Sequence, residues 1–571
     1  MLGRMLADLL SVRALSAQRC YRRATAARER GDWAGAVDWY RRALARQPGH
    51  ADCHNDLGIA LCAMQDYSGA RAAFAQALAL RADFVPALVN LGQLLQSEFR
   101  DYRQAAEHFR AALALDPGHR QARNNLALAM YERGLVEEAI ACLHEALQRA
   151  PDDALAHQFM LFMSNALPQR DLDAWYAEHR LWGQQHADHL ARYAHASAGA
   201  ARRLRIGYVS ADLREHATAG FVRPIFACHD RDSFEVFCYS NSDETDAMTQ
   251  EMQREAHGWR AIAGIDDAQA AQLIHADAID ILVDLSGHTR GNRLGVFARK
   301  PAPVQIGYLG YLNTSGMAAM DYRISDANAD PPGASDRLHS EILLRMPQTL
   351  WCYQPSEDAP SVTSAPVERN GHITFGSFNH IAKLNERVLN LWAELMRRLP
   401  ASRLLVMASP DEQTADRIHT AMERQGIDGA RLRILPRLAR AQYWQMFGEV
   451  DISLDPFPYS GGATTCESLW MGVPVVTLAG GFGFARSAVT VLANAGLAEL
   501  VAADERQYIE IAVRLASAAP RLGELRSGMR ARLRRSPLLD AAGFTRDLED
   551  RYRMVWTQWC ARQREGRGDA C

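Results

Sequence analysis

The stretch 453–470 has the residue types of a phosphate-binding turn. It reads SLDPFPYSGGATTCESLW, in which an apolar run ends at Asp455, a turn rich in proline and glycine follows, and a helix is expected to begin near Thr464. Free N–H groups and hydroxyls of Ala463, Thr464 and Thr465 at a helix N-terminus favour a phosphate ligand. A plain threonine-capped helix has the same spacing and is the alternative interpretation.

Two further features of this stretch bear on the nature of the ligand. Gly461 and Gly462 carry no side chain, so they let a ligand come close to the backbone. Glu467 lies one turn into the predicted helix, where its carboxylate would accept hydrogen bonds from ribose hydroxyls. The pattern suits a phosphorylated ligand that carries a sugar as well as it suits a plain helix cap.

Polar residues also follow two other apolar runs. The string GSFNHIAK offers Asn379 and His380 as hydrogen-bonding groups, and Lys383 as a compact positive charge for a diphosphate. The string SADLREH ends in His216, a candidate general base or sugar ligand. Taken alone, an exposed loop lysine and a structural histidine are the commoner uses of these residues.

Two loops rich in glycine and hydroxyl groups complete the set of polar stretches. SGHTR ends at Arg290, a candidate phosphate ligand, and YLGYLNTSG contains Gly310 and Thr314. Loops of this composition suit a sugar better than a flat aromatic cofactor. The sequence has no GxGxxG after a strand, no GxxxxGK[ST] and no HExxH. The triplet Asp230-Arg231-Asp232, which resembles an acidic metal-sugar motif, precedes a predicted strand instead of following one, so we infer no metal site.

Two predicted series of short strands, alternating with amphipathic helices, must position these loops. The first series comprises 204–210, 234–239, 279–285 and 304–308, and the second comprises 372–378, 403–408, 432–435, 450–454 and 474–478. Such alternation predicts parallel, doubly wound sheets, which bind ligands beyond the carboxyl ends of their strands. A proline-rich stretch, 355–366, separates the series. We therefore expect two Rossmann-like domains, 201–354 and 367–571, facing each other across a cleft.

Ahead of these domains the chain repeats itself four times, at 17–50, 51–84, 85–119 and 120–153. A small residue stands at position eight of each unit (Ala24, Gly58, Gly92 and Ala127), and a large one stands in each second helix (Tyr40, Phe74, Phe109 and Leu143). Helix pairs of this kind bury their apolar faces only by stacking. The pattern closely resembles tetratricopeptide repeats and predicts an all-α superhelix over residues 1–153.

Position six of each unit is expected on the concave side of that superhelix. It holds Asn90 and Asn125 in the third and fourth units. An amide there can donate to and accept from the backbone of an extended peptide, whatever its side chains. Alternatively, the two asparagines fill the inner helix face. Residues 154–200 leave the repeat register and are predicted to form a helical bridge.

Bulk composition excludes several classes of protein. The 571 residues are 48% hydrophobic and 23% charged with a net charge of −3, which gives no reason to expect a nucleic-acid or membrane surface. No apolar run reaches the ~18 residues of a membrane helix. Arg4, Asp8 and Arg13 interrupt the first twenty residues, which we interpret as helix and not as a signal peptide. Ten scattered cysteines without a CxxC pair are typical of a cytoplasmic protein without a disulfide framework.

Four strings together resemble the O-linked N-acetylglucosamine transferase family and its SPINDLY-type branch. They are RIGYVSADLREH, KPAPVQIGYLGYLNTSGMAAMDY, FGSFNHIAKL and PFPYSGGATTCESLWMGVPVVTL. The resemblance covers the repeats, the bridge and both predicted sheets in the same order. It implies a two-Rossmann (GT-B) glycosyltransferase that uses neither metal nor cofactor. Such an enzyme moves a sugar, with inversion, from a nucleotide diphosphate to serine or threonine hydroxyls of proteins.

The resemblance also implies roles for individual residues. His216 matches the family's active-site histidine beside the sugar, Lys383 its diphosphate-binding lysine, and Glu467 its ribose-binding acid. Ala463, Thr464 and Thr465 match the phosphate-binding helix start. His157 is the candidate for a second catalytic histidine on the bridge.

The sequence departs from animal members, which have Asp at the place of Glu467 and His-Thr-Thr near Gly462-Ala463-Thr464. It is closer there to SPINDLY-type enzymes, some of which transfer fucose from a guanosine donor. We expect UDP-N-acetylglucosamine as donor and protein or peptide acceptors along the repeats, with GDP-fucose as the alternative donor. A further alternative, from a different class, is a repeat scaffold whose sheets no longer catalyse.

Overall fold

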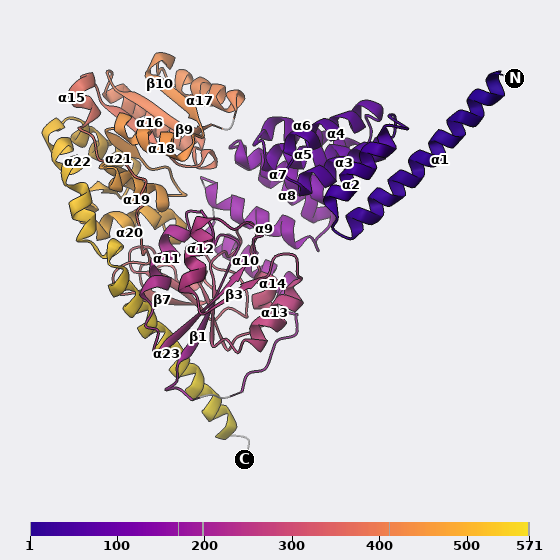
Figure 1. Cartoon of the computed structure of the whole chain (residues 1–571). Coiled ribbons are helices and arrows are strands. Elements are labelled where there is room, and N and C mark those ends of the chain that lie inside the picture. Colours follow the sequence, from indigo (N-terminus) through magenta and orange to yellow (C-terminus); the bar gives the residue numbers. More distant parts are fainter. Residues whose placement is uncertain (1, 169–170, 197–198, 410, 569–571) are drawn as a thin grey trace. The chain divides into compact units, whose positions relative to one another are not determined.

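The computed structural model describes residues 2–168, 171–196, 199–409 and 411–568. The chain divides into two compact units, Met1–Asp153 and Ala154–Cys571 (Figure 1). The helices of unit 1 are α1 (Leu2–Glu29), α2 (Trp33–Leu44), α3 (Ala51–Ala63), α4 (Tyr67–Leu80), α5 (Val85–Ser97), α6 (Tyr102–Leu115), α7 (Arg120–Glu132) and α8 (Val136–Arg149).

Unit 1 consists of successive antiparallel helix pairs, as the repeats predict. The small residue of a unit lies directly under the large residue of the same unit: a Cβ added to Gly58 would lie 2.5 Å from the Phe74 ring, and one added to Gly92 would lie 2.7 Å from Phe109. Both rings are buried. The large residue of each of these units therefore packs against the small residue of the same helix pair.

Aspartates determine where the second helices of the first three units begin. Asp32, Asp66 and Asp101 stand at the N-cap, and each carboxylate accepts the backbone N–H three residues on. This satisfies one of the free N–H groups of the first helical turn.

Unit 2 contains the bridge and two α/β lobes. Its helices are α9 (Ala154–Met163), α10 (Leu172–His186), α11 (Ala219–Cys228), α12 (Ala247–Glu255), α13 (Asp267–Ala276), α14 (Leu294–Ala298), α15 (Pro366–Asn370), α16 (Glu386–Arg398), α17 (Glu412–Arg424), α18 (Arg440–Met446), α19 (Ala463–Trp470), α20 (Ser487–Asn494), α21 (Glu505–Ala516), α22 (Ala519–Arg534) and α23 (Ala541–Gly568). Its strands are β1 (Leu204–Ser210), β2 (Phe234–Ser240), β3 (Gly258–Ala261), β4 (Ile281–Asp284), β5 (Val304–Gly307), β6 (Tyr322–Asp326), β7 (Ile342–Met346), β8 (Thr374–Ser377), β9 (Arg403–Ser409), β10 (Leu432–Pro436), β11 (Ile452–Leu454), β12 (Val475–Leu478) and β13 (Val501–Ala502).

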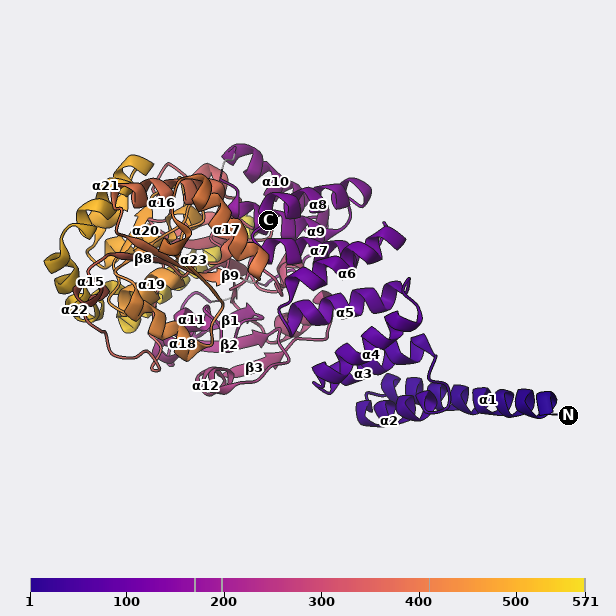
Figure 2. The ribbon, with the colours of Figure 1, turned by 90° about the horizontal axis from the view of Figure 1, so that it is seen from above.

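Both sheets are parallel and doubly wound, which confirms the predicted fold class. The first lobe has the strand order β3-β2-β1-β4-β5-β6-β7, and the second lobe has the order β10-β9-β8-β11-β12-β13. In each sheet the direction of winding reverses between the two central strands, β1 and β4 or β8 and β11. Figure 2 shows α16 beside α21 over the second sheet, and the two helices are in contact. Ligands of such sheets bind where the winding reverses, beyond the strand ends.

Four strands were not predicted from the sequence: β3, β6, β7 and β13. The sequence of β6 is YRISD, and its Arg323 is buried against Asp330, with Nη1 2.9 Å from Oδ2. A charged residue normally marks an exposed position, so this internal ion pair hid the strand. The bridge is also shorter than predicted, because α10 ends at His186 and no helix follows it up to β1 within the described residues.

The last helix packs on the first lobe although it follows the second lobe in sequence. Glu549 of α23 accepts hydrogen bonds from His229 Nδ1 and from the Asp230 backbone N–H, both at 2.8 Å. The hydroxyls of Tyr552 and Tyr208 lie 3.2 Å apart in the same buried cluster. Figure 1 shows α23 in yellow running past β1. The sequence did not predict this return within the range 367–571.

Among the described residues, no helix has the length and hydropathy to cross a membrane. Nor does any group of three or more His, Cys, Asp or Glu side chains in that part of the chain have the arrangement of a metal site. Its nine cysteines are all unpaired, and Cys571 lies outside it.

Candidate functional site

Polar side chains gather at the carboxyl ends of β8 and β11, where the second sheet reverses its winding. The loop after β8 supplies Asn379, and its short 3-10 helix Ile381–Lys383 supplies the lysine. The loop after β11 begins at Asp455 and leads to α19, which starts at Ala463. The sequence predicted these two loops as a binding region, and the topology brings them together.

Asp455 holds the loop after β11 in place through hydrogen bonds to its buried carboxylate. Its Oδ1 accepts the Gly461 backbone N–H at 2.8 Å and Asn379 Nδ2 at 3.4 Å, and its Oδ2 accepts the Thr477 hydroxyl at 2.7 Å. The carboxylate is buried, and burial raises its pKa to about 6 despite these hydrogen bonds and the charge of Lys383. It remains ionised at neutral pH.

Lys383 is held on three sides. Nζ donates to the Ser460 carbonyl at 3.0 Å and lies 3.4 Å from Asn379 Oδ1, and the ammonium stands 4.1 Å from the centre of the Tyr459 ring. Burial lowers its pKa to about 8, with Asp455 acting in the opposite direction. The lysine is thus a fixed cation at neutral pH, with only part of its charge compensated.

The start of α19 lies next to this lysine. Thr464 Oγ1 donates to Asn379 Oδ1 at 3.2 Å, so one amide oxygen contacts both Thr464 and Lys383. Thr465 Oγ1 donates to the Gly461 carbonyl at 3.0 Å, which tightens the turn. First-turn N–H groups have no acceptor within their own helix. A cation and a helix N-terminus therefore share one place, which suits an anion with several oxygens.

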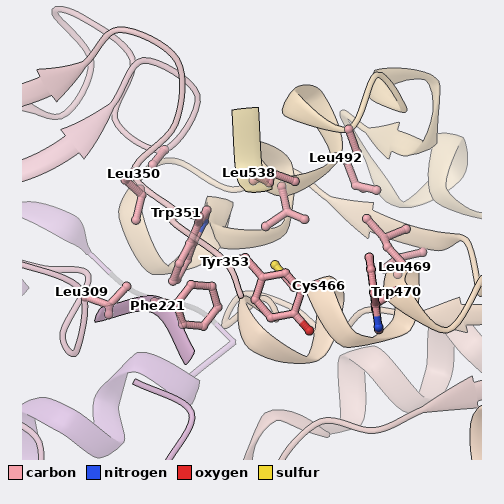
Figure 3. Close-up of a cluster of buried hydrophobic side chains, with 14 of the residues drawn as sticks. Phe221, Leu309, Leu350, Trp351, Tyr353, Cys466, Leu469, Trp470, Leu492 and Leu538 are labelled. Carbon is pink, nitrogen blue, oxygen red and sulfur yellow. The ribbon is translucent and has the colours of Figure 1, made fainter. Parts of the chain in front are cut away.

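A hydrophobic cluster between the lobes supports this helix start. A Cβ at Gly462, the N-cap, would lie 2.8 Å from the ring of Trp351. Figure 3 shows Trp351 beside Phe221 of α11, with Tyr353 and Cys466 next to them. The rings of Phe221 and Trp351 are centred 4.9 Å apart. Gly462 is thus required for close packing as well as for access to the backbone.

Glu467 lies one turn into α19, where Tyr443 of α18 donates a short hydrogen bond to its carboxylate. Burial raises the pKa of Glu467 to about 6, and Tyr443 and Arg440 partly offset this. Arg440, at the start of the same helix, forms an ion pair with Glu215 of the first lobe. Helix α18 thus connects the second-lobe site with the loop that carries His216.

His216 stands in the loop after β1, at the winding reversal of the first sheet. Its Nδ1 lies 3.2 Å from Thr218 Oγ1 and 3.7 Å from the Asp212 carboxylate, and 44% of its side chain is exposed. Partial burial lowers the pKa of His216; Asp212 opposes this, and Arg214 and Arg437 add to it. The imidazole is therefore neutral at pH 7, half exposed and able to accept a proton.

Comparison with known proteins is consistent with this architecture. The glycosyl transferase family 41 profile matches residues 156–359 and 361–548, and a tetratricopeptide repeat profile matches 27–95 and 94–160. The chain belongs to glycosyltransferase family 41. The O-GlcNAc transferase of Thermobaculum terrenum, solved as a point mutant, is similar to this chain: the two are 37% identical with a TM-score of 0.85, over 90% of this chain and 98% of that one. This match confirms the GT-B arrangement.

Plant relatives of this family 41 chain are longer proteins. A probable UDP-N-acetylglucosamine–peptide N-acetylglucosaminyltransferase SPINDLY from Solanum lycopersicum is 40% identical over 419 residues, which is 72% of this chain and 45% of the relative. A probable enzyme of the same activity from Arabidopsis thaliana, SEC, is 29% identical over 378 residues, or 64% of this chain and 38% of the relative. The chain thus spans less than half the length of these relatives.

Two of the three predicted ligand residues of the first lobe, Thr314 and Gly310, pack against other parts of the protein. Thr314 is fully buried, and its hydroxyl donates to Glu341 at 2.6 Å. A Cβ at Gly310 would lie 2.0 Å from the Leu285 carbonyl, so this glycine lets two loops pack. Arg290 is exposed in the loop after β4. Of the three, only Arg290 presents its side chain to solvent.

His157 is buried in the bridge within a histidine pair. Its Nδ1 lies 3.3 Å from His186 Nε2, and its Nε2 lies 2.9 Å from Glu178. Nearby, His179 Nε2 lies 2.8 Å from the Tyr311 hydroxyl of the first lobe. The bridge is thus bound to the first lobe through polar contacts, and His157 is less accessible than His216.

His380 and Asn90 have local partners. His380 caps the 3-10 helix, where its Nδ1 accepts the Ala382 N–H at 3.2 Å. Asn90 Nδ2 donates to Asn55 Oδ1 of the preceding repeat at 3.0 Å. Asn125 lies at the equivalent position and is half-buried. The Asn90 bond runs from one repeat to the next, as expected for a face shared by all repeats.

Sequence reasoning missed Tyr443, Tyr459 and the role of Asp455. Each lies beside a predicted residue in space, and only Asp455 offered a signal in the sequence, as the first polar residue after a buried strand. Tyr443 sits on a helix that the predicted elements omitted.

Proposed function

We propose that this protein transfers N-acetylglucosamine from UDP-N-acetylglucosamine to serine or threonine hydroxyls of proteins, with inversion and without a metal ion. The observation that carries the proposal is the cluster of Lys383, Asn379 and Thr464 at the start of α19. This cluster combines a fixed cation with a helix N-terminus at the winding reversal of a parallel sheet. The names of the relatives supply the sugar and the nucleotide.

The leaving group determines what the site must do. As the bond between the anomeric carbon and the diphosphate oxygen breaks, negative charge grows on the diphosphate. Lys383 and the N–H groups of α19 act where that charge appears, and this is the role a metal ion takes in other transferases. Glu467, ionised above pH 6, would accept hydrogen bonds from the ribose.

Inversion follows from a single displacement. The acceptor hydroxyl oxygen forms its bond to the anomeric carbon on the face opposite the departing diphosphate, and the hydroxyl proton passes to a base. His216 fits this role better than His157, because it is neutral at pH 7 and half exposed. His157 is enclosed by His186 and Glu178.

We assign unit 1 to binding protein acceptors, through the inner face that carries Asn90 and Asn125.

Unpaired cysteines and the absence of a membrane-crossing helix among the described residues fit a cytoplasmic enzyme, the location we propose.

A donor panel tests the proposal. UDP-N-acetylglucosamine should raise the melting temperature and be hydrolysed, and in the presence of an acceptor protein it should give a β-linked product that EDTA does not reduce. Turnover of GDP-fucose alone would replace the donor assignment. Absence of both stabilisation and hydrolysis with every donor would leave a repeat scaffold as the remaining function.

A further inference from the structure

Asp455 stands at the centre of the second-lobe site without pointing at any ligand position. Its three side-chain partners come from three different elements: Gly461 from the turn before α19, Asn379 from the loop after β8, and Thr477 from β12. Only 1% of the residue is exposed. A buried carboxylate with this set of donors holds the three elements in one arrangement.

Asn379 extends the influence of Asp455 to the two groups that would face the diphosphate. The amide Nδ2 is fixed by Asp455, so the amide oxygen points the other way, to Lys383 Nζ and Thr464 Oγ1. Both ends of the amide favour this orientation, because Asp455 accepts from Nδ2 while Lys383 and Thr464 donate to Oδ1. Without the carboxylate, Nδ2 loses its acceptor and the amide is held from one end only.

We propose that Asp455 is a positioning residue that holds Asn379 in its orientation and supplies the negative charge that faces the Lys383 ammonium at the start of α19. This inference rests on the proposed role of Lys383 at the diphosphate. The other titratable groups packed here are Tyr459, whose ring stacks on the lysine, and Tyr508, whose hydroxyl donates to the Asp455 backbone carbonyl. Both are neutral at pH 7, because burial raises the pKa of Tyr459 to about 12 and that of Tyr508 well above its ordinary value. Asp455 is therefore the negative charge nearest to Lys383 in this group.

The chain offers a matched control at the other end of β11. Asp451 is equally buried, and its carboxylate also accepts two backbone N–H groups, from Val367 at 2.9 Å and Thr374 at 2.8 Å. It lies before the strand, on the side away from Lys383. Asp455→Asn and Asp451→Asn thus remove the same kind of buried charge, and only the first removes it beside the site.

The test measures the pKa of Lys383 directly. Full-length wild type and both variants are labelled with trace acetic anhydride over a pH series, and the acetylation of Lys383 is read by mass spectrometry. In Asp455→Asn the pKa of Lys383 should fall by about one unit or more, and kcat should drop roughly tenfold or more with a smaller change in KM. In Asp451→Asn the Lys383 profile and kcat should remain those of the wild type.

Several outcomes decide the matter. An unchanged Lys383 profile in Asp455→Asn, or the same shift in Asp451→Asn, overturns the inference. A lowered Lys383 pKa with undiminished transfer supports the link from Asp455 to Lys383 and instead refutes the proposed role of Lys383. If Asp455→Asn does not fold, Asp455→Ser keeps a small hydrogen-bonding group but removes the charge, and it should lower the pKa of Lys383 in the same direction; an unchanged Lys383 profile there overturns the inference.

Discussion

Lys383 carries its charge in surroundings that oppose it. Burial brings its pKa down to about 8, whereas a lysine in the unfolded chain keeps its ordinary value. The folded protein therefore binds fewer protons than the unfolded chain between these values, so stability rises with pH across that window and the charge costs stability below pH 8. A diphosphate at this place would compensate the charge.

The rate of transfer should follow the charge on Lys383. For the wild type, kcat/KM should fall as pH rises through about 8, because the free enzyme loses the ammonium there. Lys383→Ala should lower turnover roughly 100-fold or more and remove this alkaline decline, since the lost cation acts where charge develops. Steady-state kinetics over a pH series measures both effects.

His216→Ala provides the contrast. It should lower turnover while UDP affinity stays at the wild-type value, whereas Lys383→Ala should weaken UDP binding as well.

Lys383→Ala should unfold at the wild-type temperature or above it at pH 7, where the buried charge is costly. Near wild-type transfer by Lys383→Ala would show that the loop has another function.

At the scale of elements, aspartates at strand ends shape the loops. Asp284 at the end of β4 accepts the N–H groups of Ser286 and Gly287, Asp326 at the end of β6 accepts those of Asn328 and Ala329, and Asp455 after β11 accepts that of Gly461. Each carboxylate turns the chain as it leaves the sheet. The loops thus start in fixed directions, which is what a preorganised site requires.

The contact between Gly462 and Trp351 makes a second prediction at this scale. Gly462→Ala places a methyl group against the indole ring, so the start of α19 must shift, and KM for the donor should rise roughly tenfold with little change in overall fold. Combining it with Trp351→Phe, which shortens the ring, should recover part of the affinity.

A double-mutant cycle on donor affinity measures this coupling. Gly371→Ala, at a helix end with open space around its Cβ, controls for a general glycine effect, although its positive φ makes some strain inevitable there. Strictly additive effects of Gly462→Ala and Trp351→Phe would mean that the ring does not position the helix.

Sequence predicted the site better than it predicted the supporting elements. The apolar runs of β8 and β11 were predicted as strands, and the loops that follow them carry Asn379, Lys383 and Thr464. Because the two strands are neighbours in a parallel sheet, these loops lie at the same edge. The strand β6 was not predicted because Arg323 is neutralised internally by Asp330. The Thr314 hydroxyl, predicted as a sugar ligand, donates to Glu341, a partner that the sequence alone does not reveal. Whether such a polar side chain faces a ligand or a protein partner depends on residues elsewhere in the chain, which the local sequence pattern does not identify.

At the scale of the whole molecule, unit 1 should affect protein acceptors and not the chemical step. Asn90→Ala combined with Asn125→Ala removes two amides from the face that would contact an extended peptide backbone. We expect KM for protein acceptors to rise, with donor hydrolysis and transfer to short peptides unchanged, because the groups around Lys383 remain intact.

Acceptor kinetics with a long and a short substrate test this expectation. Gln104→Ala on the exposed side of α6 serves as a surface control. Unaltered kinetics for the long substrate in the double variant would leave unit 1 as a spacer or as a docking surface that uses other residues. Loss of donor hydrolysis would mean that the substitutions disturb the enzyme more widely.

The return of α23 to the first lobe has a consequence for synthesis on the ribosome. Tyr208 and His229 emerge early, but Glu549 and Tyr552, which cover them, follow only after the entire second lobe. At translation rates of about 5–20 residues per second, roughly 15–65 s pass between the synthesis of His229 and that of its partner Glu549. During that interval a polar pair and its apolar surroundings stay open to water and to chaperones. Folding of the first lobe therefore depends on the synthesis of the second. A first lobe cut off at the proline-rich linker would lack α23, and Tyr208 and His229 would stay uncovered.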